Sequence, residues 1–306
     1  MANATVTMHR RDWLLLILLS VLWGGSFFFN GVALRDLPPL TIVFARVALG
    51  AAFLLPVLRL LGGTLPRGLA GWRPFFVMGL LNNVIPFSLI LAGQTYISSG
   101  LASVLNATTP LFTVLVLAGF GEERLIVRRV VGVLIGLVGV TLLRDPGLGS
   151  ARDQTIGLLL CLCGALSYGF SGLWGRRKLA HVPPITSATC QLICSALAMA
   201  IIAAAVDRPW HLAMPGLATW LALVGIAALS TSLAYVVFFR ILIRSGASNV
   251  MLVTLLIPVT AILLGTLVLG EPLSLREIAG ALIIASALIV IDGRLFSLLR
   301  RRPAPT

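Results

Sequence analysis

Long stretches of apolar residues with few or no charged side chains recur along the whole chain. They run for 17 to 25 residues each, and at 1.5 Å per residue a helix of about 20 residues crosses a hydrocarbon core of about 30 Å. Of the 306 residues, 58% are hydrophobic and 11% are charged, whereas a soluble domain carries about 25% charged residues. The chain is therefore predicted to be an all-α polytopic membrane protein without a separate soluble domain.

The apolar stretches predict ten transmembrane helices, at residues 13–34, 39–61, 72–93, 97–119, 127–143, 155–175, 184–206, 216–239, 247–269 and 275–293. The first stretch is longer than the 7–15 residues of a signal-peptide core, so we expect it to remain as a helix. All four cysteines fall in spans six and seven. We interpret them as small buried residues, with a disulfide or metal binding as the alternative.

The basic residues are distributed unevenly between the two sets of loops. If the N-terminus is inside, 17 of the 23 lysines and arginines lie in inner segments and 5 in outer ones. The inner set is Arg10, Arg11, Arg59, Arg67, Arg73, Arg124, Arg128, Arg129, Arg176, Arg177, Lys178, Arg240, Arg244, Arg294, Arg300, Arg301 and Arg302. The positive-inside rule then predicts a multi-pass protein of the cell inner (plasma) membrane, embedded in lipid, with both termini cytoplasmic. This topology accounts for the net charge of +13 without a nucleic-acid partner.

An internal repeat relates the two halves of the sequence. At an offset of 145 residues, Trp23-Gly24 matches Tyr168-Gly169, and Pro38-Pro39 matches Pro183-Pro184. At an offset of 148, Pro110 matches Pro258, Glu123 matches Glu271 and Gly132 matches Gly280. Ordered matches at nearly constant offset indicate duplication of one unit.

Each copy of the unit contains five spans, so the second copy is predicted to enter the membrane upside down. The expected organisation is a first repeat at residues 1–143, a Pro/Gly-rich connector at 144–154, and a second, inverted repeat with a basic tail at 155–306. Inverted repeats are typical of alternating-access transporters. A duplicated scaffold without transport activity is the alternative.

These features together resemble the EamA-type branch of the drug/metabolite transporter superfamily. The resemblance rests on the 5 + 5 spans, Trp23-Gly24 in span one, Arg46 in span two, a proline in spans four and nine, and Gly-Glu closing each of those two spans. Within that branch the chain is most similar to bacterial exporters of amino acids and related metabolites. The resemblance implies a central cavity between spans one, three, four, six, eight and nine, with five and ten at the periphery.

Polar and aromatic side chains recur at helical spacing on six spans, and inside a bilayer such side chains turn toward protein or a watery cavity. We therefore predict a small-molecule substrate site, with polar contacts between helices as the alternative. Its residues are Trp23, Ser26, Phe27, Asn30, Asn82, Pro86, Phe87, Ser103, Asn106, Pro110, Ser167, Tyr168, Ser171, Trp174, Ser232, Tyr235, Phe239, Asn249, Thr254 and Pro258.

Three of these residues are prolines that release backbone carbonyls, because each removes the hydrogen bond to the carbonyl four residues earlier. The released groups are those of Asn82, Asn106 and Thr254, and we expect kinks there that serve either as hinges or as fixed bends.

Arg46 and a glycine pattern each allow two interpretations. Arg46 lies about 9 Å inside span two, where it either snorkels or pairs with Asp36 near the outer surface, or contacts a substrate carboxylate. The repeat places Gln191 at the equivalent position. Gly132, Gly136 and Gly139 form a close-packing face on span five, used either within the subunit or between subunits, so the protein is expected to be a monomer or a homodimer.

All ten acidic residues and all three histidines fall in loops or at span ends. Proton-coupled carriers use a titratable group near the membrane centre, so we expect alternating access without direct proton coupling. No catalytic residue, metal site or cofactor is predicted, and an enzyme is not expected. The favoured function is export of neutral or zwitterionic metabolites, including aromatic amino acids. A drug or cation efflux carrier, another metabolite carrier, a channel-like pore and a membrane receptor or scaffold are the alternatives.

Overall fold

The computed structural model describes residues 9–143 and 150–293, and every regular element in these ranges is helical. Arg144, Asp145, Arg294, Arg300, Arg301 and Arg302 lie outside them. The helices are α1 (Arg10–Ala33), α2 (Pro39–Leu60), α3 (Gly68–Gly79), η1 (Leu80–Val84), α4 (Ile85–Gln94), α5 (Ser99–Asn106), α6 (Thr109–Gly119), α7 (Val127–Leu142), α8 (Ala151–Trp174), η2 (Gly175–Leu179), α9 (Pro184–Val206), η3 (Pro209–His211), α10 (Leu217–Ala227), η4 (Ala228–Leu233), α11 (Ala234–Ser245), α12 (Ala247–Val250), α13 (Val253–Leu267) and α14 (Leu275–Asp292).

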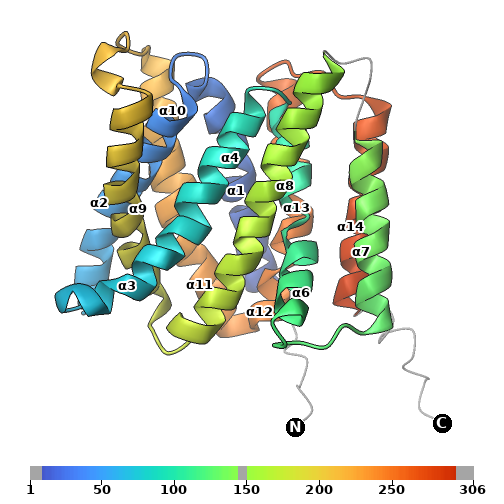
Figure 1. Cartoon of the computed structure of the whole chain (residues 1–306), viewed down its shortest axis with the longest axis horizontal. Coiled ribbons are helices and arrows are strands. Elements are labelled where there is room, and N and C mark those ends of the chain that lie inside the picture. Colours follow the sequence, from blue (N-terminus) through green and yellow to red (C-terminus); the bar gives the residue numbers. More distant parts are fainter. Residues whose placement is uncertain (1–8, 144–149, 294–306) are drawn as a thin grey trace.

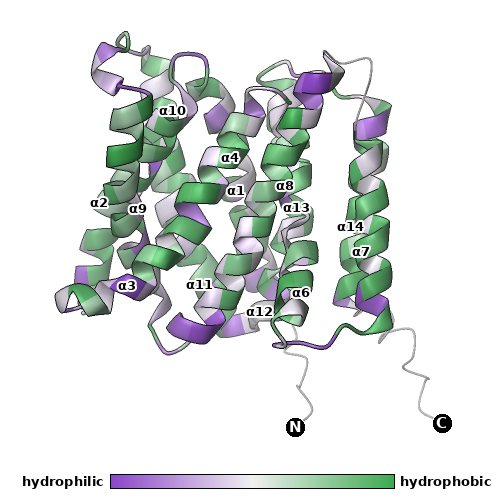
Figure 2. Cartoon of the chain, in the orientation of Figure 1, coloured by the Kyte–Doolittle hydropathy of each residue, from purple (hydrophilic) through white to green (hydrophobic). Residues whose placement is uncertain are grey.

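The helices form a bundle of roughly parallel rods, as Figure 1 shows. Within the described ranges, seven helical segments are long and apolar enough to cross a membrane, and Val253–Leu267 is a shorter apolar helix. Hydrophobic residues run along these rods and hydrophilic ones concentrate near their ends (Figure 2). Large apolar side chains such as Leu14, Leu197 and Ile201 remain exposed on the outside. An apolar exterior of this extent is what a bilayer requires.

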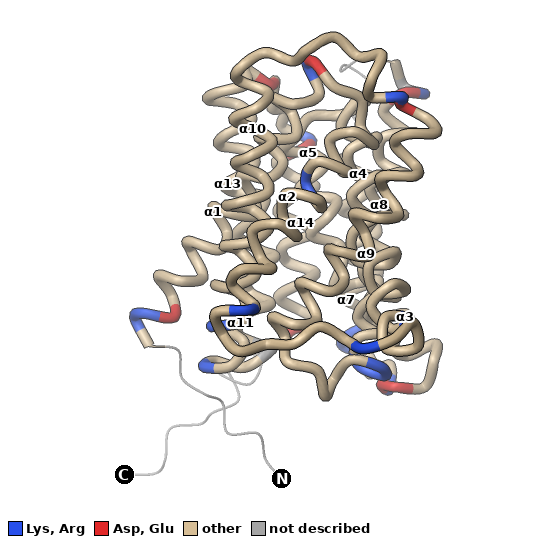
Figure 3. Tube along the Cα trace, turned by 90° about the vertical axis from the view of Figure 1, so that its left-hand side faces the viewer, with Lys and Arg blue, Asp and Glu red and all other residues tan. Residues whose placement is uncertain are grey.

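Most charged residues lie near the two ends of the bundle (Figure 3). The lower end in Figure 1 carries the start of α1, the end of α14 and the loops that follow α2, α6, η2 and α11. The upper end carries the loops after α1, α4, α9 and α13. The described lysines and arginines are more numerous at the lower end, in the distribution that the positive-inside rule describes for a cytoplasmic face.

Helices of the first half (α1 to α7) pack mainly on helices of the second half (α8 to α14). Helix α2 packs on α9, α7 on α14, and α5 on α13. Helix α1 packs on α10, α11 and α13, and α8 packs on α4, α5 and α6. Two large apolar cores result, and each draws buried residues from both halves.

Two predicted spans are interrupted rather than continuous. Span four is broken at Ala107 and Thr108 into α5 and α6, and span nine is broken at Met251 and Leu252 into α12 and α13. The break in span four precedes Pro110, which lies in the first turn of α6, where a missing N–H costs little. In span nine, Pro258 lies inside α13, well after the break.

Widened π-helical turns interrupt spans three and eight at matching places. They are η1 between α3 and α4 and η4 between α10 and α11, and a third, η2, closes α8. In η4 the hydroxyls of Thr231 and Ser232 donate to the carbonyls five residues earlier, at 2.9 Å each. Single π-helical turns occur frequently at functional sites.

The glycines of α7 are used within the subunit. A Cβ on Gly132 or Gly139 would meet a backbone carbonyl of α14 at 3.0 or 3.1 Å, and one on Gly136 would meet Leu111 of α6 at 2.5 Å. Helices α7 and α14 lie together at one edge of the bundle (Figure 1), as the resemblance implied for spans five and ten.

The four cysteines are free, and three of them are buried. The prediction of burial is wrong for Cys163, which is exposed because it lies on the outer face of α8.

Candidate functional site

A connected set of polar groups lies inside the bundle around Asn82, which η1 holds near the midpoint of Gly68–Gln94. The Asn82 amide nitrogen donates to Gln191 Oε1 and to the Tyr235 hydroxyl, at 3.2 Å each. Its amide oxygen accepts from the Ser171 hydroxyl at 3.1 Å. The network therefore joins η1 of the first half to α8, α9 and α11 of the second half.

Arg46 enters the same region from α2. Its residue exposure is 8%, its Nε donates to Thr231 Oγ1 at 3.2 Å, and its guanidinium carbon lies 3.8 Å from the centre of the Phe87 ring. The phenols of Tyr168 and Tyr235 are close enough to interact with it electrostatically. We call Arg46, Asn82, Phe87, Tyr168, Ser171, Gln191, Thr231, Tyr235 and Phe239 the central cluster.

The predicted alternative pairing between Arg46 and Asp36 is not formed. Asp36 instead accepts from the backbone N–H of Gly216 at 3.0 Å and from the Thr219 hydroxyl at 2.6 Å. It lies in the loop before α2, whereas Arg46 points into the bundle toward η4.

Aromatic rings lie in and beside the central cluster. Tyr235 and Phe239, one helical turn apart on α11, lie parallel with ring centres 5.9 Å apart. Trp23 of α1 packs against Phe238 at 5.4 Å. These rings are partly accessible rather than fully enclosed.

Several of the predicted polar residues donate to a backbone carbonyl three to five residues earlier in the chain. Ser26 donates to Trp23 O, Ser103 to Gly100 O and Thr254 to Met251 O, each at 2.6 or 2.7 Å. Asn249 donates to Ser245 O at 2.7 Å. The hydroxyl of Ser232 lies 2.9 Å from Ala227 O at the end of α10 and 3.2 Å from Gly50 O on α2. Such bonds satisfy a hydroxyl or amide in an apolar setting without a ligand.

Other predicted residues connect helices away from the central cluster. Asn30 donates to Gln94 Oε1 at 2.8 Å, and Gln94 in turn donates to the backbone carbonyl of Phe27 at 3.1 Å. Trp174 donates its indole N–H to Pro74 O at 2.9 Å, near the lower end. Ser167 donates to Leu81 O at 2.8 Å and so fastens α8 to η1.

The prolines and Asn106 complete the predicted set. Pro86 lies in the first turn of α4, which follows η1, and is buried, as is Pro258. The backbone carbonyl of Asn106, which Pro110 is predicted to release, accepts from the Thr109 hydroxyl at 2.7 Å. The amide oxygen of Asn106 is enclosed and has no partner among the described residues.

Sequence reasoning left Gln191 and Thr231 out of the predicted site. The repeat did place Gln191 opposite Arg46, and Thr231 lies in the run Ser230-Thr231-Ser232, which is unusually polar for an apolar span. Nothing in the local sequence relates Thr231 to Arg46, since 185 residues separate them.

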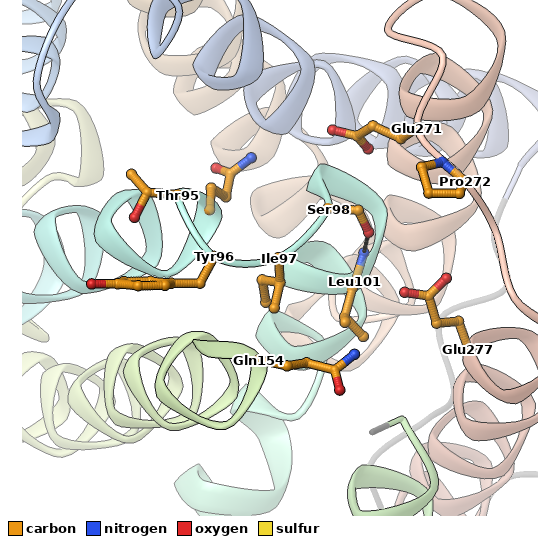
Figure 4. Close-up of a pocket in the computed structure, with 10 residues that line it drawn as sticks. Thr95, Tyr96, Ile97, Ser98, Leu101, Gln154, Glu271, Pro272 and Glu277 are labelled. Atoms are coloured by element: carbon orange, nitrogen blue, oxygen red, sulfur yellow. Dashed lines mark hydrogen bonds between the residues drawn. The ribbon is translucent and has the colours of Figure 1, made fainter. Parts of the chain in front are cut away.

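Two hollows open near the ends of the bundle. One of about 300 Å³ at the upper end is lined by Ser98, Gln154, Glu271 and Glu277 among others; Figure 4 shows both glutamates on the α13–α14 side of it, across from Ser98 and Leu101. One of about 570 Å³ at the lower end is lined by Phe120, Trp174 and Lys178 and reaches Leu81, the neighbour of Asn82.

The fold and this interior polar cluster together define a multi-pass membrane protein with a polar site between two halves. Residues 12–144 and 155–292 each match the EamA-like transporter family. The chain belongs to this family, and the resemblance seen in the sequence is confirmed.

The similarity to several known proteins extends over nearly the whole chain. An uncharacterized transporter of Archaeoglobus fulgidus is 28% identical, covering 93% of this chain and 100% of its own length. The uncharacterized inner membrane transporter YedA of Escherichia coli is 30% identical, covering 92% and 91%. A protein of Salmonella typhimurium named a probable amino-acid metabolite efflux pump is 26% identical, covering 92% and 95%. A protein of known crystal structure shares the fold, with a TM-score of 0.67 and 20% identity over 97% of this chain and 100% of its own.

Proposed function

We propose that this transporter exports small neutral or zwitterionic metabolites, amino acids with aromatic side chains included, by alternating access. The observation that carries the proposal is the central cluster, in which Asn82 of the first half binds Gln191 and Tyr235 of the second half. A carrier that opens alternately to the two sides needs its substrate site between two bodies that rock against each other. The name of the Salmonella relative supports amino acids as the substrate class.

We further propose ten membrane spans in two inverted repeats, at residues 1–143 and 155–306 with a connector at 144–154. Helix pairing supports this arrangement, because the packing of α1 on α10 and α11 has its counterpart in the packing of α8 on α4. The pairs α2 with α9 and α7 with α14 each join equivalent spans. The two separate matches to the family divide the chain in the same way.

The proposed location is the cell inner membrane, with both termini cytoplasmic. The excess of arginine at the lower end supports this orientation, and the inner-membrane relative YedA supports the compartment. Because the α7 glycine face is occupied by α14 and α6, we propose a monomer surrounded by lipid as the transporting unit. No nucleic-acid partner and no chemical change of the substrate are part of the proposal.

The proposed cycle does not use direct proton coupling inside the membrane. Every acidic residue in the described ranges lies in a loop or within the first or last turn of a helix. The hollow at the lower end, which reaches Leu81 beside Asn82, supports access to the site from the cytoplasmic side. Net movement then follows the substrate gradient or exchange against a second solute.

Counterflow in proteoliposomes tests the proposal. Saturable exchange of a labelled aromatic amino acid against unlabelled amino acid is expected from a carrier, whereas a pore gives no saturation and a receptor or scaffold gives no flux. A proton gradient alone should not drive accumulation, and uphill uptake under that condition would contradict this part of the proposal.

The variant Asn82→Leu tests the role of the central cluster. Loss of a hydrogen bond worth about 0.5–1.5 kcal/mol corresponds to substrate binding weakened by about 2- to 13-fold. Gly136→Leu is the control, because its side chain meets Leu111 at the periphery, and it should lower stability but leave affinity in the folded fraction unchanged. Normal binding by N82L together with weakened binding by G136L would move the site to other helices.

Single cysteines at Glu123 and Glu271, in a background without the native cysteines, test the inverted topology. The two positions match in the repeat and lie at the lower and upper ends. We expect a membrane-impermeant thiol reagent to label them from opposite sides of the membrane. Labelling from one side would contradict the inverted repeat.

A further inference from the structure

Arg46 is a buried cation without an anionic partner. Among the described residues no carboxylate lies within ion-pair distance of it, since the five ion pairs of these ranges involve Arg129, Arg176, Arg177 and Arg244. A guanidinium carries five N–H donors, and among the described residues the Nε–H of Arg46 has a protein acceptor, Thr231 Oγ1. Both terminal nitrogens are left without a partner in the described part of the chain.

These terminal nitrogens also border accessible space. The enclosed polar atoms that lack a partner include Asn30 Oδ1 and Asn106 Oδ1, but no nitrogen of Arg46 is among them. Phe87 covers one face of the guanidinium, and Thr231 holds Nε from η4. Phe87 and Thr231 therefore hold the guanidinium group of Arg46 in place, and its free N–H groups face the interior of the bundle.

The phenols of Tyr168 and Tyr235 lie near the guanidinium group of Arg46. The hydroxyl of Tyr235 accepts from Asn82, which leaves its own proton to be donated. The Asn82 amide oxygen lies 3.1 Å from the Ser171 hydroxyl, which can donate to it. A fixed positive charge with spare N–H and O–H donors is chemically suited to a carboxylate, which a guanidinium binds through two parallel hydrogen bonds.

We infer that Arg46 receives the carboxylate of the substrate, so that the central cluster selects solutes carrying a carboxylate and with a net charge of zero or −1, and rejects net cations. This inference rests on the proposed transport function and narrows its substrate class. A cation in this site meets the uncompensated charge of Arg46, whose repulsion is strong away from water. The neighbouring rings of Tyr235 and Phe239 suit an apolar or aromatic side chain on the same solute.

Three probes that share a phenyl ring separate the charges. They are 3-phenylpropionate, which carries only the carboxylate, L-phenylalanine, which carries both charges, and 2-phenylethylammonium, which carries only the ammonium. Binding to the purified full chain is measured by tryptophan fluorescence and by thermal shift. We expect the first two to bind at least about 10-fold more tightly than the third, as one charge-assisted hydrogen bond predicts.

The variants Arg46→Gln and Arg46→Lys test the residue itself. R46Q should weaken 3-phenylpropionate binding by about 10- to 150-fold and abolish the preference over the ammonium probe, while R46K, which keeps the charge without the guanidinium group, should fall between R46Q and the wild type. Arg59→Gln is the control, because Arg59 lies exposed near the lower end of the same helix, and it should bind all three probes normally. If R46Q does not fold, the comparison of the three probes on the wild-type protein and on R46K decides the question.

Several outcomes would overturn the inference. Wild-type protein could bind 2-phenylethylammonium as tightly as the carboxylates or more tightly, or could bind none of the three probes. R46Q could bind the carboxylates unchanged. Chloride or phosphate could raise the melting temperature as much as the carboxylates do, which would assign an inorganic-anion site. Counterflow tests the proposed function separately. Saturable exchange of a neutral or zwitterionic metabolite would support that function even where these binding results contradict the role of Arg46.

Discussion

The two ends of the bundle join the two halves of the chain by different chemistry. At the upper end, carboxylates accept hydrogen bonds at helix N-termini of the opposite half. Asp207 accepts from the N–H and hydroxyl of Thr41 at 2.7 and 2.9 Å, and both carboxylate oxygens of Glu271 accept from the N–H of Ser99 at 3.0 Å. Asp36 accepts at the start of α10 in the same manner.

At the lower end, carboxylates pair with arginines. Glu122 lies 2.6 Å from Arg177, Glu123 lies 3.1 Å from Arg176, and Asp12 lies 3.3 Å from Arg244. Lower-end loops are rich in arginine, so an acid there finds a basic partner, whereas an upper-end acid finds few and turns to the partial positive charge of a helix N-terminus.

The difference has a mechanical consequence. Backbone N–H groups are fixed by their helix, while the paired arginines are long side chains, 41% to 50% exposed for Arg176, Arg177 and Arg244. Exposed ion pairs contribute about 0–1 kcal/mol and are screened by salt, whereas a hydrogen bond to a charged group contributes about 1.5–3 kcal/mol. The upper end is therefore joined more firmly than the lower end, in keeping with the proposed access from the cytoplasm.

The largest expected effect comes from Glu271→Ala. It removes the acceptor for the N–H groups at the start of α5, so we expect the free energy of unfolding to fall by about 1.5–3 kcal/mol. Glu123→Ala, at the matching position of the first repeat, should cost about 0–1 kcal/mol. Reversible unfolding of the purified variants measures both values. Equal losses would remove the distinction between the two ends.

The stability losses of E123A and E271A should also differ in their salt dependence, and this effect is smaller. At about 1 M ionic strength the Debye length is about 3 Å, so the loss caused by E123A should disappear in 1 M NaCl because the ion pairs it removes are already screened. The loss caused by E271A should persist, since short hydrogen bonds to part-buried backbone groups do not depend on long-range attraction. Melting temperatures of both variants at low and high salt test this. A loss in E271A that also vanishes would indicate that simple charge attraction joins the upper end.

The smallest effect concerns pH at the upper end. The Thr219 hydroxyl, followed by the Gly216 N–H, lowers the pKa of the Asp36 carboxyl below its usual 3.8. A lowered pKa in the folded state means that this contribution is present above pH 3.8 and is lost as the pH falls through the folded-state pKa. The melting temperature of Thr219→Val should therefore fall less between pH 5 and pH 3 than that of the wild type. An identical pH dependence would show that the hydroxyl does not act on Asp36.

Much of the architecture could be predicted from local pattern, but the contacts of the site could not. Apolar length alone placed Asn82 and Arg46 inside the membrane, and the repeat placed Gln191 opposite Arg46. The interruption of span four had a local signal in Pro110, and Ser99–Gly119 is still long and apolar enough to cross a membrane. The π-helical turns were not predicted. In η4 the hydroxyls of Thr231 and Ser232 donate to carbonyls five residues earlier, whereas in η1 the amides of Asn82 and Asn83 bind side chains of α9.

By itself, the sequence determined the membrane setting, the helical class, the repeat and the family, because these follow from the length of apolar stretches and the order of a few residues along one chain. The tertiary structure alone decided that Arg46 faces Thr231 and Phe87 rather than Asp36, and that Asn82 binds Gln191 and Tyr235. These partners are 41 to 185 residues apart. Which of several polar groups on neighbouring helices meet depends on helix rotation and depth, and these are set by packing over the whole bundle.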